Sequence, residues 1–459
     1  MTKIKLISPI DGSIYLEREA ASLEEAKNTI TNAKQAQKAW AARSLDERID
    51  LVMAGVKKLH EMNDEIVFEL AHQMGRPVRY GGEFGGVNER SEYMASIAKE
   101  TLAPIIIEKS DKFERYIKRE PHGLVFVIAP WNYPFMTAIN SIVPALIAGN
   151  AIILKHASQT LKVGERLEQA FHEAGVPKEL FQNLVLTHET TSSLISSNNF
   201  DFINFTGSVG GGRAIEKAAA GTFTPIGLEL GGKDPGYVME DADLDAAVET
   251  LIDGAMFNSG QSCCGIERIY VCEKLYDEFV KKAVAIVSAY KLGNPLDKET
   301  TLGPLAAVRF AQDVRAQIDD ALAKGATALI DKNLFSQDDG GAYLAPQILI
   351  NVTHDMAIMR DETFGPAVGI MKVKSDEEAI ALMNDSEFGL TASLWSNDIE
   401  RARLIGEKIE TGTVFMNRAD YIDPALCWTG CKNTGRGGAM SIIGYQNLTR
   451  PKSYHLKRL

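Results

Sequence analysis

Residues 202–220 read FINFTGSVGGGRAIEKAAA, and this stretch decides the fold. The apolar run Phe202–Phe205 predicts a buried strand, and Arg213–Ala220 predicts a helix. Glycines fill the turn between them, which leaves the backbone N–H groups at the start of the helix open to an anion. Such a turn suits the pyrophosphate of a dinucleotide, although its spacing differs from GxGxxG and is a weak indication by itself.

The neighbouring sequence repeats this alternation of short apolar runs and helical stretches. Between residues 121 and 231 it predicts buried strands at Leu124–Ala129, Ala151–Leu154, Asn183–Leu186 and Phe202–Phe205. Strands that alternate with helices are typical of a parallel α/β sheet. After Gly232 a second α/β pattern begins, with helical periodicity from Leu244 to Ala255. We therefore predict two α/β units.

Two further segments lie outside this alternation. The first hundred residues are mostly helical in pattern, with a helix start at Ser22 followed by Glu24 and Glu25. Residues 103–107 and 113–118 then predict a hairpin of two strands. Because this hairpin leaves the main pattern, we expect it to form a contact between subunits.

The composition excludes several classes of protein. The chain has 459 residues, with 49 Lys and Arg against 61 Asp and Glu, and a formal net charge of −12. This charge argues against broad binding of nucleic acid or of an anionic membrane, since both require a basic face. The five cysteines lack metal-finger spacing and the eight histidines are scattered, so we expect a reducing compartment and no metal site. The N-terminus has no apolar signal region, which predicts a soluble, cytoplasmic protein.

Cys263 is the first candidate for chemistry. It lies in Gly260–Cys264 (GQSCC), between a helical stretch and the strand Arg268–Val271. A cysteine in such a turn can face a cleft, but only a few per cent of a free thiol is ionised at pH 7, so a nucleophile needs a partner. The alternative is that Cys263 and Cys264 are two small, buried hydrophobic side chains.

Three further motifs carry polar groups. Glu229, in Leu228–Lys233 (LELGGK), precedes a double glycine, and burial there would raise its pKa toward that of a neutral-pH base. The alternative is a solvated loop carboxylate. Asn132, in Pro130–Pro134 (PWNYP), is held by two prolines and can donate to a developing oxyanion, unless the turn is purely structural. Residues 361–366 (DETFGP) add a carboxylate for hydroxyl groups and an aromatic face for a planar ring.

In their order and spacing, these motifs are far more specific than any one of them alone. From about Ile7 to the C-terminus, the chain resembles the NAD(P)-dependent, non-acylating aldehyde dehydrogenase superfamily. The motifs that carry the resemblance are PWNYP, IILK, FTGS, LELGGK, GQSC, ETFGP and FMN. The resemblance implies an α/β fold with a Rossmann-like cofactor domain, an α/β catalytic domain and a β-hairpin oligomerisation element.

The resemblance also implies a catalytic set of three residues. Cys263 is similar to the nucleophile that attacks the aldehyde to give a thiohemiacetal and, after oxidation, a thioester. Asn132 and the backbone N–H of Cys263 would stabilise the oxyanion. Glu229 would activate the water that releases the carboxylic acid. Cys264 would only pack.

A site for NAD(P) is implied as well. The residues similar to the family's cofactor contacts are Trp131, Lys155, Ser158, Gly207, Ser208, Gly212, Leu230, Glu362 and Phe364. NAD-preferring members carry Glu at the third position after the lysine, where this chain has Ser158. A serine can donate to a 2′-phosphate that a carboxylate would repel, and Lys155 and a charged His156 would add positive charge. We therefore predict that NADP is accepted; the alternative is that Ser158 is merely tolerated and NAD binds through Lys155.

The sequence does not select one aldehyde. The residues expected to shape the pocket are Tyr133, Thr137, Phe257, Arg418, Asp420 and Trp428. Arg418 could pair with a carboxylate, which would indicate a semialdehyde. Asp420 and Asp423 could attract an amine, which would indicate an aminoaldehyde, or they could pair with Arg418 or face solvent. These interpretations stay open at this point.

The predicted architecture has three parts. The cofactor domain comprises residues 1–101 and 122–231, the catalytic domain 232–446, and the oligomerisation element 102–121 and 447–459. We expect a small-molecule aldehyde as substrate, a homodimer or homotetramer, and neither nucleic acid nor a membrane as partner. Two alternatives remain. Glu229 argues against a CoA-acylating semialdehyde dehydrogenase, since acylating relatives commonly lack this base, and the retained catalytic set argues against a non-catalytic, crystallin-like member.

Overall fold

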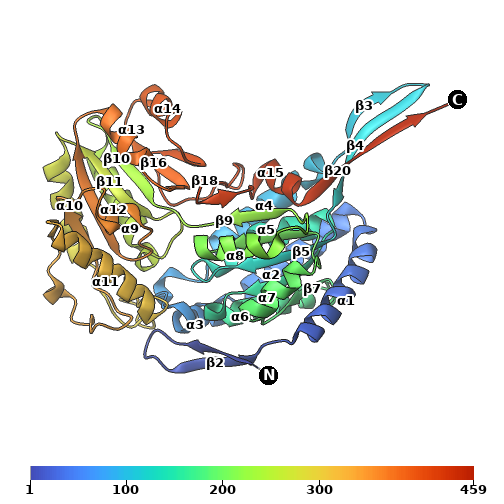
Figure 1. The fold of residues 1–459 in the computed structure, drawn as a ribbon, viewed down its shortest axis with the longest axis horizontal. Coiled ribbons are helices and arrows are strands. Elements are labelled where there is room, and N and C mark those ends of the chain that lie inside the picture. The colour runs from blue at the N-terminus through green and yellow to red at the C-terminus, as the bar shows by residue number, and fades with distance from the viewer. Residues whose placement is uncertain (1) are drawn as a thin grey trace.

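The computed structural model describes residues 2–459 and consists of two α/β units and a sheet that projects from one end (Figure 1). The first unit is built on a six-stranded sheet in the order β19-β9-β8-β5-β6-β7. These strands are β5 Leu124–Ala129, β6 Ala151–His156, β7 Phe181–Asn183, β8 Phe202–Thr206, β9 Ile226–Glu229 and β19 Gly435–Arg436. Strands β5 to β9 pair in parallel, whereas β19 is antiparallel to β9.

Helices cover this first sheet and complete its core. They are α1 Leu23–Ala41, α2 Leu45–Glu61, α3 Asn63–Met74, α4 Phe84–Thr101, α5 Pro134–Ala148, α6 Leu161–Glu173, α7 His188–Ser196, α8 Val209–Ala219 and α15 Ser441–Asn447. Helix α5 is buried along most of its length because its sequence is predominantly apolar. Pro134 occupies its first turn, and Gly149, with φ 99°, ends it in the left-handed conformation.

The second unit is built on a seven-stranded sheet in the order β12-β13-β14-β11-β10-β16-β17. Its strands are β10 Asp234–Val238, β11 Ile266–Cys272, β12 Thr327–Ala328, β13 Gln347–Ile350, β14 Ala367–Val373, β16 Thr391–Trp395 and β17 Thr413–Met416. All of these pairs are parallel except β12 with β13. The helices are α9 Leu244–Met256, α10 Tyr276–Ser288, α11 Val308–Ala323, α12 Ala357–Arg360, α13 Asp376–Asn384 and α14 Ile399–Gly406.

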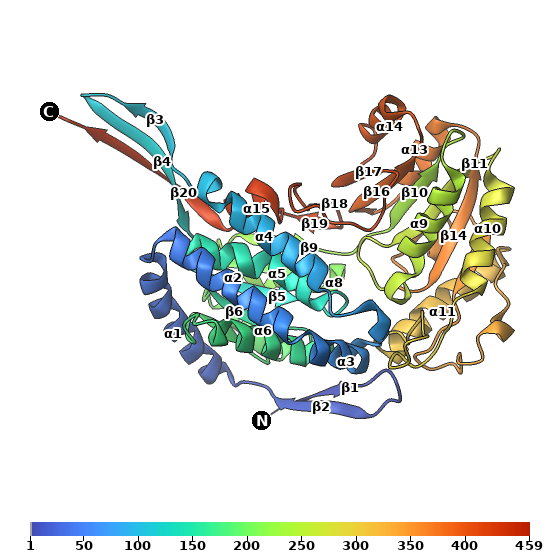
Figure 2. The same cartoon turned by 180° about the vertical axis from the view of Figure 1, so that it is seen from behind.

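The projecting sheet joins distant parts of the chain. Its strands are β3 Ile105–Lys109, β4 Phe113–Pro121 and β20 Thr449–Lys457, all antiparallel. Figure 2 shows that this sheet extends away from both units. The hairpin predicted at 103–118 is therefore present, and the C-terminal strand completes it.

Smaller elements connect the units. Strands β1 Lys3–Ile7 and β2 Ile14–Glu19 form a hairpin, and β15 Phe388–Gly389 pairs with β18 Cys431–Lys432. Short 3-10 turns occur at η1 Val78–Tyr80, η2 Ser158–Thr160, η3 Phe257–Gly260 and η4 Lys332–Leu334. The β1–β2 hairpin reaches the second unit, where the Tyr343 hydroxyl donates to the Ile10 carbonyl at 3.2 Å.

The structure differs from the sequence prediction in three places. The N-terminal hairpin was not anticipated, because its strands are only partly buried and show little alternation. The strand predicted at Asn183–Leu186 is shifted, since β7 ends at Asn183. Strand β19 returns to the first sheet, so the range 232–446 is not confined to the second sheet. The division into three domains stays a prediction.

Candidate active site

The nucleophile loop follows α9 and is shaped by backbone that turns sharply. Asn258 and Ser259 have φ values of 53° and 55°, in the left-handed region that few side chains adopt. The Gln261 side chain fixes the loop, because its Nε2 donates to the Asn258 carbonyl at 3.0 Å and its Oε1 accepts from the Ala306 N–H at 2.8 Å. This arrangement leaves Cys263 half-buried and Cys264 buried. Within residues 2–459, the N–H of Cys263 donates no hydrogen bond and is free for a ligand.

Asp420 holds the cysteine loop through two hydrogen bonds. Its Oδ1 accepts from the Ser262 hydroxyl at 3.0 Å and from the Cys264 thiol at 3.0 Å. Burial raises the pKa of Asp420 and, together with hydrogen bonding to Cys263, that of the Cys264 thiol. Within residues 2–459 Asp420 forms no ion pair with Arg418, and its role in the loop was not visible in the sequence.

Asn132 lies against the same loop. Its Nδ2 donates to the Gln261 carbonyl at 3.2 Å, and the side chain is buried. Arg76 holds the backbone of Asn132, because its Nη2 donates to the Asn132 carbonyl at 2.6 Å and its Nε donates to Asn258 Oδ1 at 3.2 Å. Arg76 also forms a buried ion pair with Glu83. Sequence reasoning missed both members of this pair, because they are distant in the chain from every motif.

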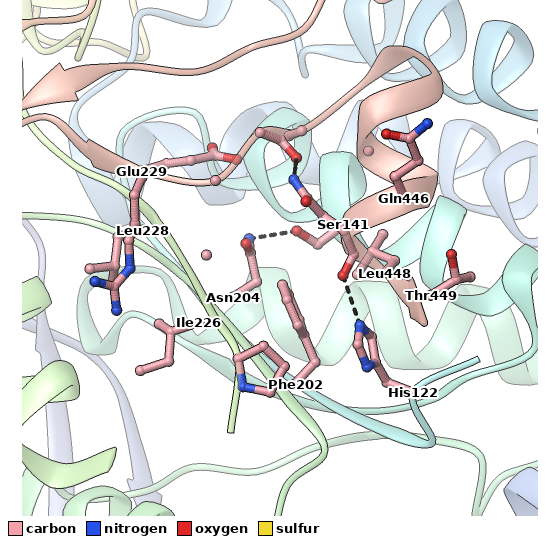
Figure 3. A pocket seen from close by; sticks show the side chains of 18 of the residues that line it. His122, Ser141, Phe202, Asn204, Ile226, Leu228, Glu229, Gln446, Leu448 and Thr449 are labelled. Atoms are coloured by element: carbon pink, nitrogen blue, oxygen red, sulfur yellow. Dashed lines mark hydrogen bonds between the residues drawn. The ribbon is translucent and has the colours of Figure 1, made fainter. Parts of the chain in front are cut away.

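Glu229 ends strand β9. Burial raises its pKa to about 7, while the Thr206 hydroxyl, 3.4 Å away, and the charge of Arg90 lower it. Its side chain lines a cavity of about 270 Å³, and several other polar side chains line the same cavity (Figure 3). Asn204 Nδ2 donates to the Ser141 hydroxyl at 2.6 Å in this cavity, and His122 lies at the opposite side from Glu229. The arrangement supplies a carboxylate that can exchange protons near neutral pH beside a cavity able to hold water.

The glycine-rich turn begins α8. Ser208 is the N-cap residue, and its hydroxyl accepts from the Gly211 N–H at 3.2 Å. At Gly212 a Cβ atom would lie 2.7 Å from the Leu230 side chain, so a larger residue would require Leu230 to shift. Leu230 itself donates its N–H to the Thr434 carbonyl at 2.9 Å. The first turn of α8 thus presents N–H groups of the kind that bind phosphate.

Lys155 and Ser158 line one cleft beside this sheet, together with Asn183 and Leu184. Lys155 is buried, and burial lowers its pKa. Within residues 2–459 its ammonium group makes no ion pair, which leaves a positive charge for an anion. His156 adds none at neutral pH, because burial lowers its pKa to about 4. Of the two residues, only Lys155 therefore offers positive charge to an anion.

Glu362, Trp131 and Phe364 lie where the two units face each other. Glu362 Oε1 accepts from the Gly232 N–H at 3.1 Å, and burial raises the pKa of Glu362 to about 8. The Trp131 ring packs edge-on against the Phe364 ring, with 5.5 Å between their centroids, and stacks on the Phe310 ring, with 5.0 Å between centroids. These contacts form an aromatic wall beside the Glu362 carboxyl group.

The expected substrate residues are only partly brought together. Tyr133 and Phe257 line a cavity of about 400 Å³ with Met136, and Thr137 donates to the Tyr133 carbonyl at 2.7 Å. Trp428 is buried. Arg418 is exposed and lies over the Tyr421 ring at 3.5 Å, so its side chain is engaged at the surface.

Residues 2–459 contain neither a cluster of metal-binding side chains nor a membrane-spanning helix. No group of three His, Cys, Asp or Glu side chains in this part of the chain is arranged to hold a metal ion. None of the helices in the same range is both long and apolar enough to cross a bilayer.

Comparison with known proteins identifies the family. The sequence model described as "Aldehyde dehydrogenase family" matches residues 1–454. A succinate-semialdehyde dehydrogenase [NADP(+)] of Deinococcus radiodurans is 32% identical over 97% of this chain and 93% of its own. A peroxisomal aminoaldehyde dehydrogenase of Pisum sativum is 34% identical over 97% of this chain and 90% of its own.

Solved structures agree in fold. The succinic semialdehyde dehydrogenase of Streptococcus pyogenes, in complex with NADP+, has a TM-score of 0.94 at 29% identity and covers 99% of this chain and 100% of its own. The mixed α/β architecture with its two mainly parallel sheets agrees with this likeness. The chain belongs to the aldehyde dehydrogenase family and is an NAD(P)-dependent oxidoreductase that oxidises an aldehyde.

Proposed function

We propose that Cys263 is the nucleophile, that Asn132 and the Cys263 N–H hold the oxyanion, and that Glu229 is the base. The observation that carries this proposal is the link between Asn132 Nδ2 and the Gln261 carbonyl at 3.2 Å. It brings an amide donor from the end of β5 to the cysteine loop, while the Cys263 N–H keeps no other acceptor within the described residues. Two donors beside one thiol suit a tetrahedral oxyanion.

The reaction then runs in two stages. The Cys263 thiolate attacks the aldehyde carbon, and the C–S bond forms a thiohemiacetal whose oxygen is held by the two donors. NAD(P), when bound, supplies the two-electron oxidant that converts this adduct into a thioester. Glu229 takes a proton from water, the resulting hydroxide attacks the thioester, and the C–S bond breaks to release the acid and the thiolate. The polar cavity at Glu229 supports this role, since it offers a path for that water.

The residues present fit a dinucleotide. The open N–H groups of α8 suit its pyrophosphate, and unpaired Lys155 beside Ser158 suits the adenosine ribose or its phosphate. Glu362 and Phe364 would bind the nicotinamide half, with Trp131 packed against Phe364 and Leu230 supplying a backbone contact. Because Ser158 can donate where a carboxylate would repel, acceptance of NADP is part of the proposal.

We propose further that the protein assembles through the projecting sheet and acts in the cytoplasm. Ile105, Ile106 and Ile107 on β3 are each more than half exposed, which supports burial against a second copy of the chain. A homodimer or homotetramer is expected. The five cysteines are all free, which supports a reducing compartment such as the cytoplasm.

The test is formation of reduced cofactor by the purified protein with a panel of neutral, amino- and carboxy-aldehydes, with NAD and NADP in parallel. Turnover without CoA, with release of the free acid, is the expected result. Turnover only with CoA would move the chain to acylating chemistry. Cofactor binding without turnover under either condition would overturn the catalytic assignment.

A further inference from the structure

Arg90 is a buried cation whose charge has no partner. It lies on α4, which packs along α5 (Figure 2), and only 7% of its surface is exposed. Its Nη1 donates to the Met136 carbonyl and to Asn140 Oδ1, both at 3.2 Å. Both acceptors are neutral, and within residues 2–459 Arg90 makes no ion pair. A buried charge without a counter-ion is costly, so its retention calls for a ligand.

The free edge of the guanidinium has the shape that binds a carboxylate. Nε is buried and donates to no acceptor among the described residues, and no hydrogen bond is formed by Nη2 there. An arginine presents five N–H donors, and the adjacent Nε–H and Nη2–H form a fork that matches the two oxygens of a carboxylate. The bonds through Nη1 anchor the side chain to α5, so this fork is held in one orientation.

Two neutral donors on the neighbouring helix are unpartnered as well. Asn140 Nδ2 and the Tyr133 hydroxyl are buried and have no hydrogen-bond partner among residues 2–459. Tyr133, Met136 and Asn140 follow the spacing of one face of α5. Tyr133 lines the cavity of about 400 Å³, and Asn140 lines the cavity that contains Glu229. Arg90 is therefore hydrogen-bonded to one lining residue of each cavity, Met136 and Asn140.

These unpartnered donors lie near the proposed catalytic residues. Tyr133 is the neighbour of Asn132 in the chain, Asn140 lines the same cavity as Glu229, and the charge of Arg90 lowers the pKa of Glu229. The other nearby cation, Arg76, is already paired with Glu83. Arg90 thus remains a buried cation without an ion pair among residues 2–459, and its charge favours an anionic substrate over an aminoaldehyde.

We infer that the Nε and Nη2 edge of Arg90 binds the distal carboxylate of a carboxy-aldehyde and so makes the enzyme selective for semialdehydes. Asn140 and Tyr133 supply further donors to the bound anion. The inference rests on the proposed function, in which Cys263 attacks the other end of the same molecule. It also differs from the sequence-based candidate Arg418, whose side chain stacks on Tyr421.

The experiment compares carboxy-aldehydes of graded length with neutral analogues in which a methyl ester or amide replaces the carboxylate. In Arg90→Met, kcat/KM for the carboxy-aldehyde should fall roughly 10- to 150-fold, the range of a hydrogen bond to a charged group. The value for the neutral analogue should change less than threefold. Arg90→Lys should restore part of the loss, because it keeps the charge without the fork.

Arg48→Met is the matched control. Arg48 is half-buried and donates to the carbonyls of Ala41, Arg43 and Ile147. Like Arg90, it therefore binds backbone carbonyl groups, but it lies on α2. Its variant should change both substrates alike. Equal losses for both substrates in Arg90→Met would overturn the inference, as would a wild-type preference for neutral or amino-aldehydes.

A second measurement does not need turnover. A dicarboxylate that matches the product should raise the melting temperature of the wild-type holoenzyme and of Arg48→Met, but not that of Arg90→Met. Stabilisation of all three proteins would overturn the carboxylate site. If no aldehyde is oxidised at all, the proposed function fails, and this binding test still decides the role of Arg90.

Discussion

The Cys264 thiol donates to Asp420 Oδ1 over 3.0 Å, and this contact fastens the cysteine loop to a residue that follows β17. The same oxygen accepts from the Ser262 hydroxyl. Cys263 lies between these two donors in the chain, so the position of its thiol depends on one carboxyl group. The backbone of Asp420 lies in the left-handed region, with φ 49°, which costs some free energy. This conformation accompanies the contact of its side chain with the loop.

Replacing Asp420 by Ala should loosen this loop. Two buried donors would lose their acceptor, so the free energy of unfolding should fall by about 1–3 kcal/mol. Thermal or denaturant unfolding measures this change. Cys264→Ala leaves the Ser262 bond in place and should cost less. If Asp420→Ala unfolds like the wild type, the contact does not contribute to stability.

Cys263→Ala should abolish formation of reduced cofactor, because no thiohemiacetal can form. Fluorescence titration should show that NAD(P) still binds with wild-type affinity. Cys264→Ala is the matched control and should retain most of the activity, because its thiol is buried and engaged with Asp420. Normal turnover in Cys263→Ala would show that the nucleophile is another residue.

Glu229 should govern the pH dependence of acid release. Its pKa is raised to about 7, and a base acts when ionised, so the rate of thioester hydrolysis should rise as the pH increases through about 7 and then level off. Stopped-flow absorbance of reduced cofactor separates the first turnover from the steady state.

Glu229→Gln should lower the steady-state rate by roughly 10²–10⁴-fold, the usual contribution of a general base, while the initial burst of reduced cofactor remains. Glu249→Gln, at an exposed position on α9, is the control and should keep the wild-type profile. A Gln variant at position 229 with an unchanged pH profile would place the base elsewhere.

Ser158→Glu should shift the cofactor preference. A carboxylate in the cleft of Lys155 would repel the 2′-phosphate, so kcat/KM with NADP should fall at least about tenfold, whereas the value with NAD should stay within threefold. Ser158→Ala, which removes only the donor, should have the smaller effect. Equal losses with both cofactors would contradict a contact between Ser158 and the 2′-phosphate.

Ile106→Lys should weaken assembly through the projecting sheet. Ile106 is 60% exposed, and burying such a side chain contributes about 1.5–3 kcal/mol, so the dissociation constant should rise at least tenfold. Light scattering coupled to gel filtration measures the mass as a function of concentration. Ile399→Lys on α14, where an isoleucine is 69% exposed, is the control. An unchanged assembly in Ile106→Lys would locate the interface elsewhere.

Much of the fold followed from local patterns. Strand β5 has the predicted bounds, and helix α9 begins at the predicted Leu244, because their apolar periodicities are strong. Helix α1 begins after Ser22 as predicted, and Ser22 forms a capping box with Glu25. The β1–β2 hairpin and the shift of β7 were missed, because short edge strands gain their stability from neighbours rather than from their own pattern.

The sequence by itself determined the order and spacing of the motifs that mark the family. It also determined the choice of Cys263, Glu229, Asn132 and the turn at Gly207 as candidate site residues. Each of these motifs is short, and its local chemistry is readable without a structure. Only the tertiary structure decided that Asp420 binds Cys264, that Arg76 holds Asn132, and that Arg90 is buried without a counter-ion. The reason is physical: these contacts depend on which faces of distant helices and strands pack together, and that choice is made by the whole core rather than by any one segment.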